Sequence, residues 1–568
     1  MRTETNQRIK EVRAALLLLS VMVLSACGGG NEATTEDESS DDTSALPIVV
    51  SDTTFRSAHF SGSGNCAACH NNLTDASASD VSIESDWSAS MMANSTRDPF
   101  WRAKVASEIR RNPALKPVLD DKCSRCHAPM ANVEAAYEGS PVELFGNGFL
   151  NPQNPYYNHG MDGVSCTACH QIEDNGKLGT LEGFSGKFSI VDLGASQRTA
   201  FGQYTDPAIN PMLNDTGFLP TYAAHISSSA MCATCHNLKT PFVDSLGNVV
   251  STTPETEFPE QMVYTEWDNS SFASGATARS CQDCHMPKTD GVIISTRPVS
   301  LTARNDFSRH TLVGANTTML DIFAQNKDAL GVAADGFDSA ILRTRDMLAS
   351  AAELEVVSQS RVNDQLIVQL RINNRSGHKL PTSFPSRRAY IHFVVRDAGG
   401  NIIFESGKTN ADGSIVGADA DTNLTRFETH YDEITQPDQV QIYEAIMQDT
   451  DHNVTYTLLR AASFVKDNRI PPAGFDKNSV GENIRVVGAA LSDANFNSGS
   501  DTITYKVPVG LADSVSYSAE LKYQALAYSF IKDLFQDNLN PEVAVFEALY
   551  TSAKIRAETI AVISRSLP

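Results

Sequence analysis

The sequence predicts a multidomain fold in four parts: a loop-rich, mostly α-helical region, a helical connector, an all-β sandwich domain and a C-terminal helix. Three observations lead to this prediction. Clusters of Cys and His interrupt the first region, apolar residues recur at helical spacing in the connector, and from about residue 353 the apolar period changes to two. The predicted boundaries of the four parts are 52–315, 316–352, 353–530 and 531–568.

The pattern Cys-x-x-Cys-His occurs five times in the first region. With 11 Cys and 13 His in 568 residues, chance predicts roughly 0.005 matches. The pattern is the attachment signature of c-type haem, in which two thiols bind the porphyrin and the imidazole ligates the iron. Zinc sites do not need a His after each Cys pair, so we predict five haem c groups. The motifs are Cys66/Cys69/His70, Cys123/Cys126/His127, Cys166/Cys169/His170, Cys232/Cys235/His236 and Cys281/Cys284/His285.

The chain carries a formal net charge of −23 at pH 7, while its apolar fraction of 41% is ordinary. The deficit of Lys and Arg argues against a nucleic-acid partner, because phosphate binding depends on those side chains. The acidic balance favours cationic partners or metal ions, although a solvated acidic surface explains it equally well. The length leaves room for roughly two to four domains.

Three histidines precede motifs at one offset. His59, His159 and His225 each lie seven residues before the first cysteine of a motif, which gives His-x6-Cys-x-x-Cys-His three times. Low-spin haem iron takes a second ligand on its opposite face, and neutral imidazole supplies it well. We interpret these histidines as distal ligands; the alternative is three unrelated loop histidines. Spacing does not decide which haem each one serves.

The second and fifth motifs lack this histidine and have Lys116 and Ser274 at that offset. His310 and His378 complete a set of five distal ligands, although His378 lies in the predicted β domain. Met92 competes with them, because a thioether can ligate haem iron and raise its potential. Met92 can equally be core filler. If His378 is not a ligand, one haem has an open position.

Residues 1–26 are predicted to be a lipoprotein signal peptide. A basic start is followed by the apolar run Ala14–Leu24, which is too short to span a bilayer. The run ends in Leu24-Ser25-Ala26-Cys27, which resembles a bacterial lipobox and implies lipidation of Cys27; a plain secretory peptide is the alternative. Gly28 in place of Asp implies the outer membrane. Both alternatives place the chain outside the cytoplasm, with residues 27–51 as a flexible acidic tether.

Strands are predicted where apolar residues alternate between turn signals, a pattern typical of an antiparallel β-sandwich. The segments are Gln365–Ile372, Tyr390–Val395, Ile402–Phe404, Val440–Met447, Thr455–Leu459, Thr502–Val507 and Ser514–Tyr523. Apolar spacing predicts a closing helix at Val543–Ser566. Arg387 and Arg388 are either a solvated pair or partners of haem propionates.

The first region resembles the multihaem cytochromes of the cytochrome c-554 type, over about half of the chain. The residues that carry the resemblance are Gly62-Ser63-Gly64-Asn65-Cys66, Gly163-Val164-Ser165-Cys166, Ser227 to Cys232, Pro259-Glu260-Gln261, Tyr264-x-Glu266-Trp267 and Cys281 to Pro287; Gly377 to Pro385 resembles an element of accessory domains in the same cytochromes. The family has Trp-x-x-Ser-x-His where this chain has Met92 and Phe272.

These observations favour an electron carrier, which relays electrons through its haems and needs no substrate chemistry. The alternative is a multihaem oxidoreductase that acts on a small nitrogen or sulfur compound at a haem with an open axial position. A docking role for the β domain is a third possibility. Expected partners are redox proteins or an extracellular acceptor, with the outer membrane reached through the lipid anchor. The sequence leaves open whether the chain forms an oligomer or a filament.

Overall fold

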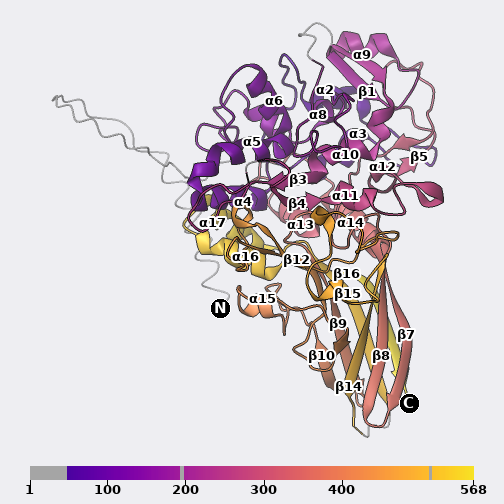
Figure 1. Ribbon diagram of the computed structural model, residues 1–568. Coiled ribbons are helices and arrows are strands. Elements are labelled where there is room, and N and C mark those ends of the chain that lie inside the picture. The colour runs from indigo at the N-terminus through magenta and orange to yellow at the C-terminus, as the bar shows by residue number, and fades with distance from the viewer. Residues whose placement is uncertain (1–47, 192–197, 252, 511–513) are drawn as a thin grey trace, which may run out of the picture. The chain divides into compact units, whose positions relative to one another are not determined.

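The structure is a computed structural model that describes residues 48–191, 198–251, 253–510 and 514–568. The predicted signal peptide, Cys27 and nearly all of the predicted tether lie outside the described residues. The described chain begins with helices joined by loops, continues through two adjacent helices and then forms long strands (Figure 1). None of the helices in these ranges is both long and apolar enough to cross a membrane.

Residues 52–315 form short helices joined by loops. The helix that begins at Pro99 is capped by Asp98. The carboxylate of Asp98 accepts hydrogen bonds from the N–H groups of Phe100 and Trp101. The helices are α2 (Ser63–His70), α3 (Ile83–Ser88), α4 (Pro99–Arg111), α5 (Lys116–His127), α6 (Pro129–Tyr137), α7 (Tyr157–Met161), α8 (Cys166–Cys169), α9 (Ile209–Thr216), α10 (Ser229–His236), α11 (Val263–Asp268) and α12 (Cys281–His285). Three two-stranded sheets accompany them: β1 (Arg198–Gly202) with β2 (Phe218–Tyr222), β3 (Asn237–Thr240) with β4 (Phe258–Met262), and β5 (Lys288–Thr289) with β6 (Phe307–Ser308).

Two helices occupy the segment predicted as a helical connector. They are α13 (Thr317–Gln325) and α14 (Phe337–Ala351), and they pack against each other. Gly336 precedes α14 with a φ of +96°, a left-handed conformation that a side chain would strain. The apolar faces of both helices are buried in a cluster that includes Phe530 and Phe546 from the C-terminal part of the chain.

From residue 352 onwards two sheets pack face to face. One has the strand order β13-β12-β9-β15-β16, with β10 paired to β9, and the other has the order β11-β14-β8-β7. The pairings are antiparallel except that of β11 with β14. The bounds are β7 (Ala352–Val362), β8 (Gln365–Asn374), β9 (Arg388–Asp397), β10 (Ile402–Ser406), β11 (Glu433–Ile434), β12 (Ile442–Gln448), β13 (Ser463–Asp467), β14 (Ser500–Pro508), β15 (Val515–Gln524) and β16 (Glu558–Leu567).

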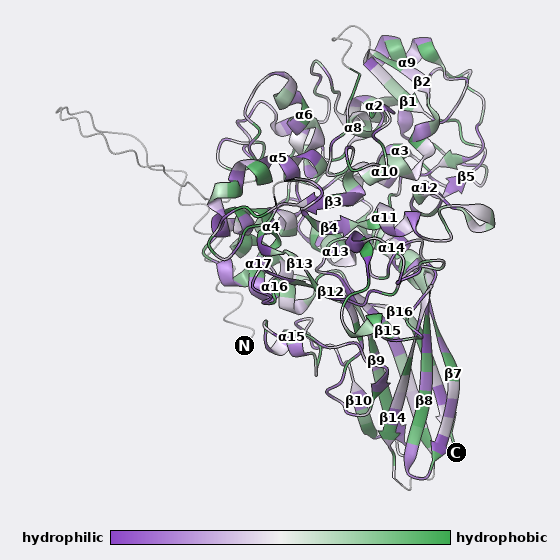
Figure 2. Ribbon diagram, viewed as in Figure 1, coloured by the Kyte–Doolittle hydropathy of each residue, from purple (hydrophilic) through white to green (hydrophobic). Residues whose placement is uncertain are grey.

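The alternating pattern of the strands builds the core between the two sheets. Leu366, Val368 and Leu370 of β8 are fully buried, and the residues between them are not. Figure 2 shows this alternation as bands of colour along the long strands. Because successive side chains of a strand point to opposite faces, the apolar ones of both sheets meet in one cluster. Within it Phe393 of β9 stacks on Tyr505 of β14, with ring centroids 4.0 Å apart.

The predicted closing helix at Val543–Ser566 is wrong in its second half. Helix α17 (Pro541–Ser552) follows α16 (Tyr528–Leu534), but the last residues of the chain form β16, which pairs with β15. Ala561 and Ile563 pack against the core of the sandwich, whereas Val562 between them is 63% exposed, as expected for alternating sides of a strand. A short β-branched run fits both periods, and pairing with the edge of β15 decides between them.

The strand predicted at Thr455–Leu459 is also wrong. This segment leads into a 3₁₀ turn at Leu458–Arg460. The backbone N–H groups of Leu458 and Leu459 donate to the buried carboxylate of Glu108 on α4, at 2.6 and 3.2 Å. A contact with a distant helix therefore overrides the local β propensity.

Neither interpretation of Arg388 from the sequence is correct. Arg388 begins β9 and is fully buried. Two of its nitrogens donate to the two carboxylate oxygens of Asp421 at 2.8 Å, and a third donates to Gln524. Burial opposes the charge, but Asp421 nevertheless raises the pKa of Arg388 above its usual value. A guanidinium paired in this way is neither solvated nor free to bind a propionate.

Asp421→Asn should lower the stability of the protein, because it leaves the charge of Arg388 buried without a counter-charge. Removing one partner of a buried pair costs about 3–5 kcal/mol. We expect the urea midpoint to fall accordingly. The control is Lys408→Ala at the exposed pair with Glu405, which should change the stability by less than about 1 kcal/mol. Equal midpoints for Asp421→Asn and the parent chain would contradict this expectation.

Candidate functional site

The five Cys-x-x-Cys-His motifs lie at the C-terminal ends of α2, α5, α8, α10 and α12. The histidine is the last residue of four of these helices and the C-cap of α8. All ten cysteines and all five histidines of the motifs line one cavity of about 1450 Å³. A single small-molecule site is typically about 300–1,000 Å³. The cavity is therefore larger than one small ligand requires.

In four motifs one nitrogen of the imidazole is held by the backbone. Nδ1 lies within hydrogen-bond distance of a carbonyl, and because a carbonyl only accepts, Nδ1 carries the proton and Nε2 keeps its lone pair. Metal-bound histidines are fixed in this way by the nitrogen that does not bind the metal. The pairs are His70 with Ile294 (2.6 Å), His127 with Ser95 (3.1 Å), His170 with Phe201 (2.6 Å) and His285 with Val313 (2.5 Å).

In four motifs, burial favours the neutral form of the imidazole, which is the form that binds a metal. Burial lowers the pKa of His127 to about 4. The side chain of His236 faces the cavity, and burial within the protein likewise lowers its pKa to about 4. The pKa values of His70 and His170 are also lowered by burial. These side chains are therefore uncharged at neutral pH.

Two predicted distal histidines lie opposite motif histidines. The ring centroids of His170 and His310 are 6.3 Å apart with planes inclined by 25°, and those of His285 and His378 are 6.4 Å apart with planes inclined by 22°. A metal–imidazole bond is about 2 Å long and a ring centroid lies about 1 Å behind its nitrogen, so two imidazoles on one iron have centroids about 6 Å apart. Both separations match this geometry.

Two of the other predicted distal ligands lie elsewhere. Neither His59 nor His225 is among the described wall residues of the cavity. Nδ1 of His59 is 3.3 Å from a carboxylate oxygen of Glu134, and its ring stacks on Tyr137. Nε2 of His225 is 2.8 Å from the carbonyl of Ile172. In this arrangement Nε2 of His225 carries the proton, so only Nδ1 is available to a metal.

His159 and Met92 differ from these two. His159 also lies outside the cavity wall, is buried, and has no hydrogen-bond partner at either ring nitrogen within the described part of the chain. A buried polar group without a partner is costly, and a metal ion is one group that would satisfy it. Met92 does line the cavity, as does Phe272 at the corresponding place before the fifth motif.

Thiols of different motifs touch one another inside the cavity. The free thiols form three hydrogen-bonded pairs: Cys66 with Cys166, Cys232 with Cys281, and Cys126 with Cys235. The helices agree with this, because α2 contacts α8 and α10 contacts α12. The first motif is therefore beside the third, and the fourth is beside both the second and the fifth.

The donor set fits c-type haem. Each motif would hold one porphyrin through its two thiols and present one neutral imidazole to the iron. When bound, the haem supplies an iron that accepts and gives up one electron at a time. The residues of the chain fix the direction of the imidazole, exclude water and bring the attachment sites together. Groups attached at touching motifs would be neighbours, the first with the third and the fourth with the second and the fifth.

Buried charges beside the second motif could not be found from sequence spacing. Glu260 of β4, Glu108 and Lys104 line the cavity near Cys123, and all three are at least 95% buried. Nζ of Lys104 lies 2.8 Å from Glu108 Oε1. Glu260 has a weaker contact, 3.4 Å to the Gln261 amide. Burial, together with the negative charge of the nearby Glu108, raises the pKa of Glu260 to about 7.

Arginines in the cavity wall are candidates to balance the haem propionates. Arg343 of α14 lines the cavity and has a buried Nε with no hydrogen-bond partner among the described residues. Arg387 also lines it, and donates to the carbonyl of Thr382. The neighbouring Arg388 does not take part. Arginine suits this role because its planar fork matches a carboxylate.

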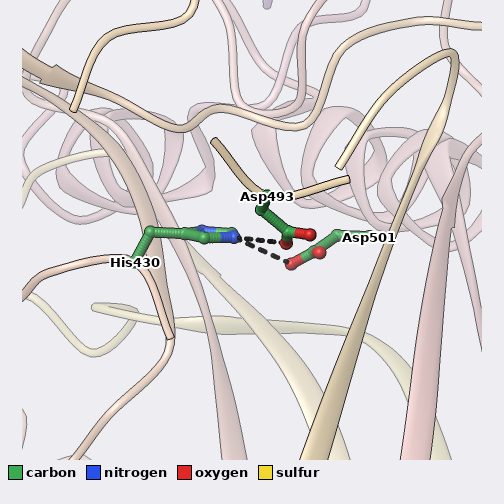
Figure 3. Close-up of side chains that lie close together, drawn as sticks. All are labelled: His430, Asp493 and Asp501. Carbon is green, nitrogen blue, oxygen red and sulfur yellow. Dashed lines mark hydrogen bonds and ion pairs between the residues drawn. The ribbon is translucent and has the colours of Figure 1, made fainter. Parts of the chain in front are cut away.

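A second group of ligand-type side chains lies in the sandwich (Figure 3). Nε2 of His430 is 3.1 Å from Asp493 and 3.9 Å from Asp501. Nδ1 of the same ring faces the side-chain NH₂ groups of Gln441 and Asn468, at 3.0 and 3.1 Å. Because these groups only donate, Nδ1 must accept and Nε2 must carry the proton.

The two amides that set this tautomer are themselves fixed. The side-chain oxygen of Gln441 accepts from the N–H of Tyr431, and that of Asn468 accepts from the N–H of Glu444. Nε2 of His430 is therefore a donor to Asp493 and has no lone pair for a cation. We interpret the group as a buried hydrogen-bond network and not as a metal site.

Comparisons with known proteins give one structural likeness. No family model matches the chain, and no curated protein matches it. A solved structure, described as a penta-heme cytochrome c552 from Thermochromatium tepidum, is 16% identical in sequence with a TM-score of 0.48. The match covers 90% of this chain and 99% of that chain.

Glu260→Gln should change how stability depends on pH. The pKa of Glu260 is raised from 4.5 to about 7 by burial, so the folded state binds a proton more tightly than the unfolded state. This contribution stabilises the protein below pH 4.5 and is lost as the pH rises through about 7. The variant lacks this titrating group, so its stability should not show this decline. The urea midpoints of the variant and the parent chain should therefore diverge above pH 5. Parallel profiles of urea midpoint against pH would contradict it; Glu482→Gln, at an exposed side chain, is the control.

Proposed function

We propose that the chain is an electron-transfer protein that carries five covalently attached c-type haems. One observation carries the proposal: five haem-attachment motifs, spread over the sequence from Cys66 to His285, line a single cavity. Thiol contacts link neighbouring motifs, so that electrons would pass between adjacent haems without leaving the protein. The chain's part is to set potentials through axial ligands, burial and charge.

The axial ligands follow from the ring geometry where it is available. We propose that His310 completes the haem of His170 and that His378 completes the haem of His285. His59, His159 and His225 are proposed as the remaining distal ligands, with Met92 as a competitor. For His159 the support is an imidazole that is buried and unbonded among the described residues; for the other two it is the shared spacing in the sequence.

The proposed location is outside the cytoplasm. The support is the lipobox-like segment ending in Cys27, which would anchor the chain to the outer membrane, and Gly28 after it. There the protein would serve respiration, with redox proteins or an extracellular acceptor as partners. A net charge of −23 favours partners with a positive docking surface.

A second candidate is an oxidoreductase that reduces or oxidises a small nitrogen or sulfur compound at the second haem. Within the described residues no imidazole lies opposite His70, His127 or His236 at the separation seen for the other two pairs, and the ring that stacks on His127 is Trp101. Glu260 and Lys104 are buried in the cavity wall on the side of the second motif, where they offer an acid and a cation. Such groups can move a proton or hold an anion beside an open iron position.

The first test of the proposed function is the haem count. The mature protein should carry the mass of five haems, and Cys281→Ala combined with Cys284→Ala should remove one of them. Intact-mass measurement and the absorbance of the reduced protein check this together. A parallel pair of serine changes at Ser564 and Ser566, both exposed, should leave five. A colourless protein, or one with the mass of the polypeptide and lipid alone, would refute the proposal.

The two candidate functions differ in what the ferric protein binds. A pure relay has six-coordinate, low-spin haems and should not change its spectrum with cyanide or nitrite. An open iron at the second motif should bind one equivalent, and Glu260→Gln should weaken that binding severalfold at pH 6. Titration of the wild type followed by absorbance and EPR decides between them, and saturation by one ligand per protein would favour the enzyme.

A further inference from the structure

His378 lies on a loop of the sandwich, between β8 and β9, yet its ring faces His285 of α12. A ligand that comes from a separate part of the chain can bind only if that part is held at a fixed distance. His378 Nδ1 lies 3.0 Å from the carbonyl of Lys379, which leaves Nε2 free. The question is which contacts hold the loop.

Four buried charged residues form a closed ring beside His378. Oε1 of Glu266, on α11, lies 3.0 Å from Nη1 of Arg469. Arg469 donates to both carboxylate oxygens of Asp467, at 2.9 and 2.7 Å. Nζ of Lys379 lies 2.7 Å from Asp467 Oδ2, and Glu266 Oε2 accepts from the backbone N–H of Lys379 at 3.1 Å. No side chain of the four is more than 9% exposed.

The ring holds the residue next to the proposed ligand from two directions. Lys379 is bound through its backbone N–H to Glu266 and through its side chain to Asp467. Leu380, the next residue, exchanges both backbone hydrogen bonds with Ile470, at 2.9 Å each. The loop is therefore attached to the segment that carries Asp467 and to the helix that carries Glu266.

The contacts of Glu266 reach further along the loop. Its Oε2 also accepts from the hydroxyl of Thr382, at 2.5 Å. Gly377 lies against Trp267, the neighbour of Glu266, so closely that a Cβ at Gly377 would come within 3.0 Å of the indole. Glu266 thus contacts the loop after His378, while Trp267 contacts it just before.

We propose that Glu266 and Arg469 are positioning residues that hold His378 opposite His285. The inference rests on the proposed function, because it assumes that both histidines ligate one iron. Two carboxylates and two cations make the ring neutral, so it fixes geometry without adding a net charge next to the haem. A buried ring of this kind has few alternative arrangements, since any broken pair leaves an uncompensated charge.

Ionisation of the ring agrees with this role. Burial opposes the charge of Asp467, but Arg469 and Lys379 lower its pKa to about 2. Burial also opposes the charge of Arg469, yet Asp467 and Glu266 raise its pKa above the usual value. The Asp467–Arg469 pair is therefore charged across the physiological range, whereas burial lowers the pKa of Lys379.

The experiment uses Glu266→Gln in the full haem-loaded chain. Gln keeps the shape of the side chain but removes the charge that faces Arg469. We expect about one fifth of the low-spin ferric EPR signal to broaden or to be replaced by a high-spin signal, because one of five irons has a loosely held ligand. The potential of that haem should rise, since a negative charge has been removed, while the other four stay unchanged.

The matched control is Asp421→Asn, which breaks a different buried pair of an arginine and a carboxylate, at Arg388 of the sandwich. It should lower stability without changing the EPR spectrum or any potential. If Glu266→Gln does not fold, Thr382→Val tests the same contact by removing one hydrogen bond to Glu266 without burying a charge. It should give a smaller shift of the same one haem.

His378→Ala tests the ligation by His378 separately from the positioning by Glu266. It should convert one haem to high spin, and added imidazole should restore the low-spin signal. If it does so while Glu266→Gln and Thr382→Val both match the wild type, His378 is the ligand but Glu266 does not position it, and the inference is wrong. If His378→Ala leaves all low-spin signals unchanged, the proposed ligation fails and the inference fails with it.

Discussion

An imidazole that serves a metal has to present one nitrogen in one direction, and in this protein the other nitrogen sets that direction. The carbonyls that hold the motif histidines come from distant parts of the chain: His70 depends on Ile294, 224 residues away. The loops between the motifs are therefore not free connections. Each loop has to bring its carbonyl to the imidazole that the carbonyl holds. The short helices place each cysteine pair relative to that imidazole.

The two halves of the described chain are stabilised in different ways. The sandwich buries a continuous apolar cluster contributed by both of its sheets. Residues 52–315 instead have several small clusters around a large cavity. If the proposed haems fill that space, their apolar faces supply the missing core, and this half of the protein depends on cofactor attachment in a way that the sandwich does not.

The sequence predicts features that arise from local chemistry. The motif needs its residues within one helical turn, and strands such as β8 show their period in the sequence. Features that depend on distant partners are not visible in it. The segment Glu558–Leu567 becomes a strand because the edge of β15 is there to pair with, and Arg388 is buried because Asp421 lies across from it. The ring of Glu266, Lys379, Asp467 and Arg469 has no spacing that could indicate it.

The position of His378 has a consequence for the order of assembly. Cys284 is synthesised well before His378, and Asp467 and Arg469 follow later still. If the proposed haem is joined to the last motif before the sandwich has folded, its second face would stay open until folding is complete. Chains truncated within the sandwich would then carry all five proposed haems. The iron of the last haem would lack its second ligand and be exposed to peroxide and other small molecules.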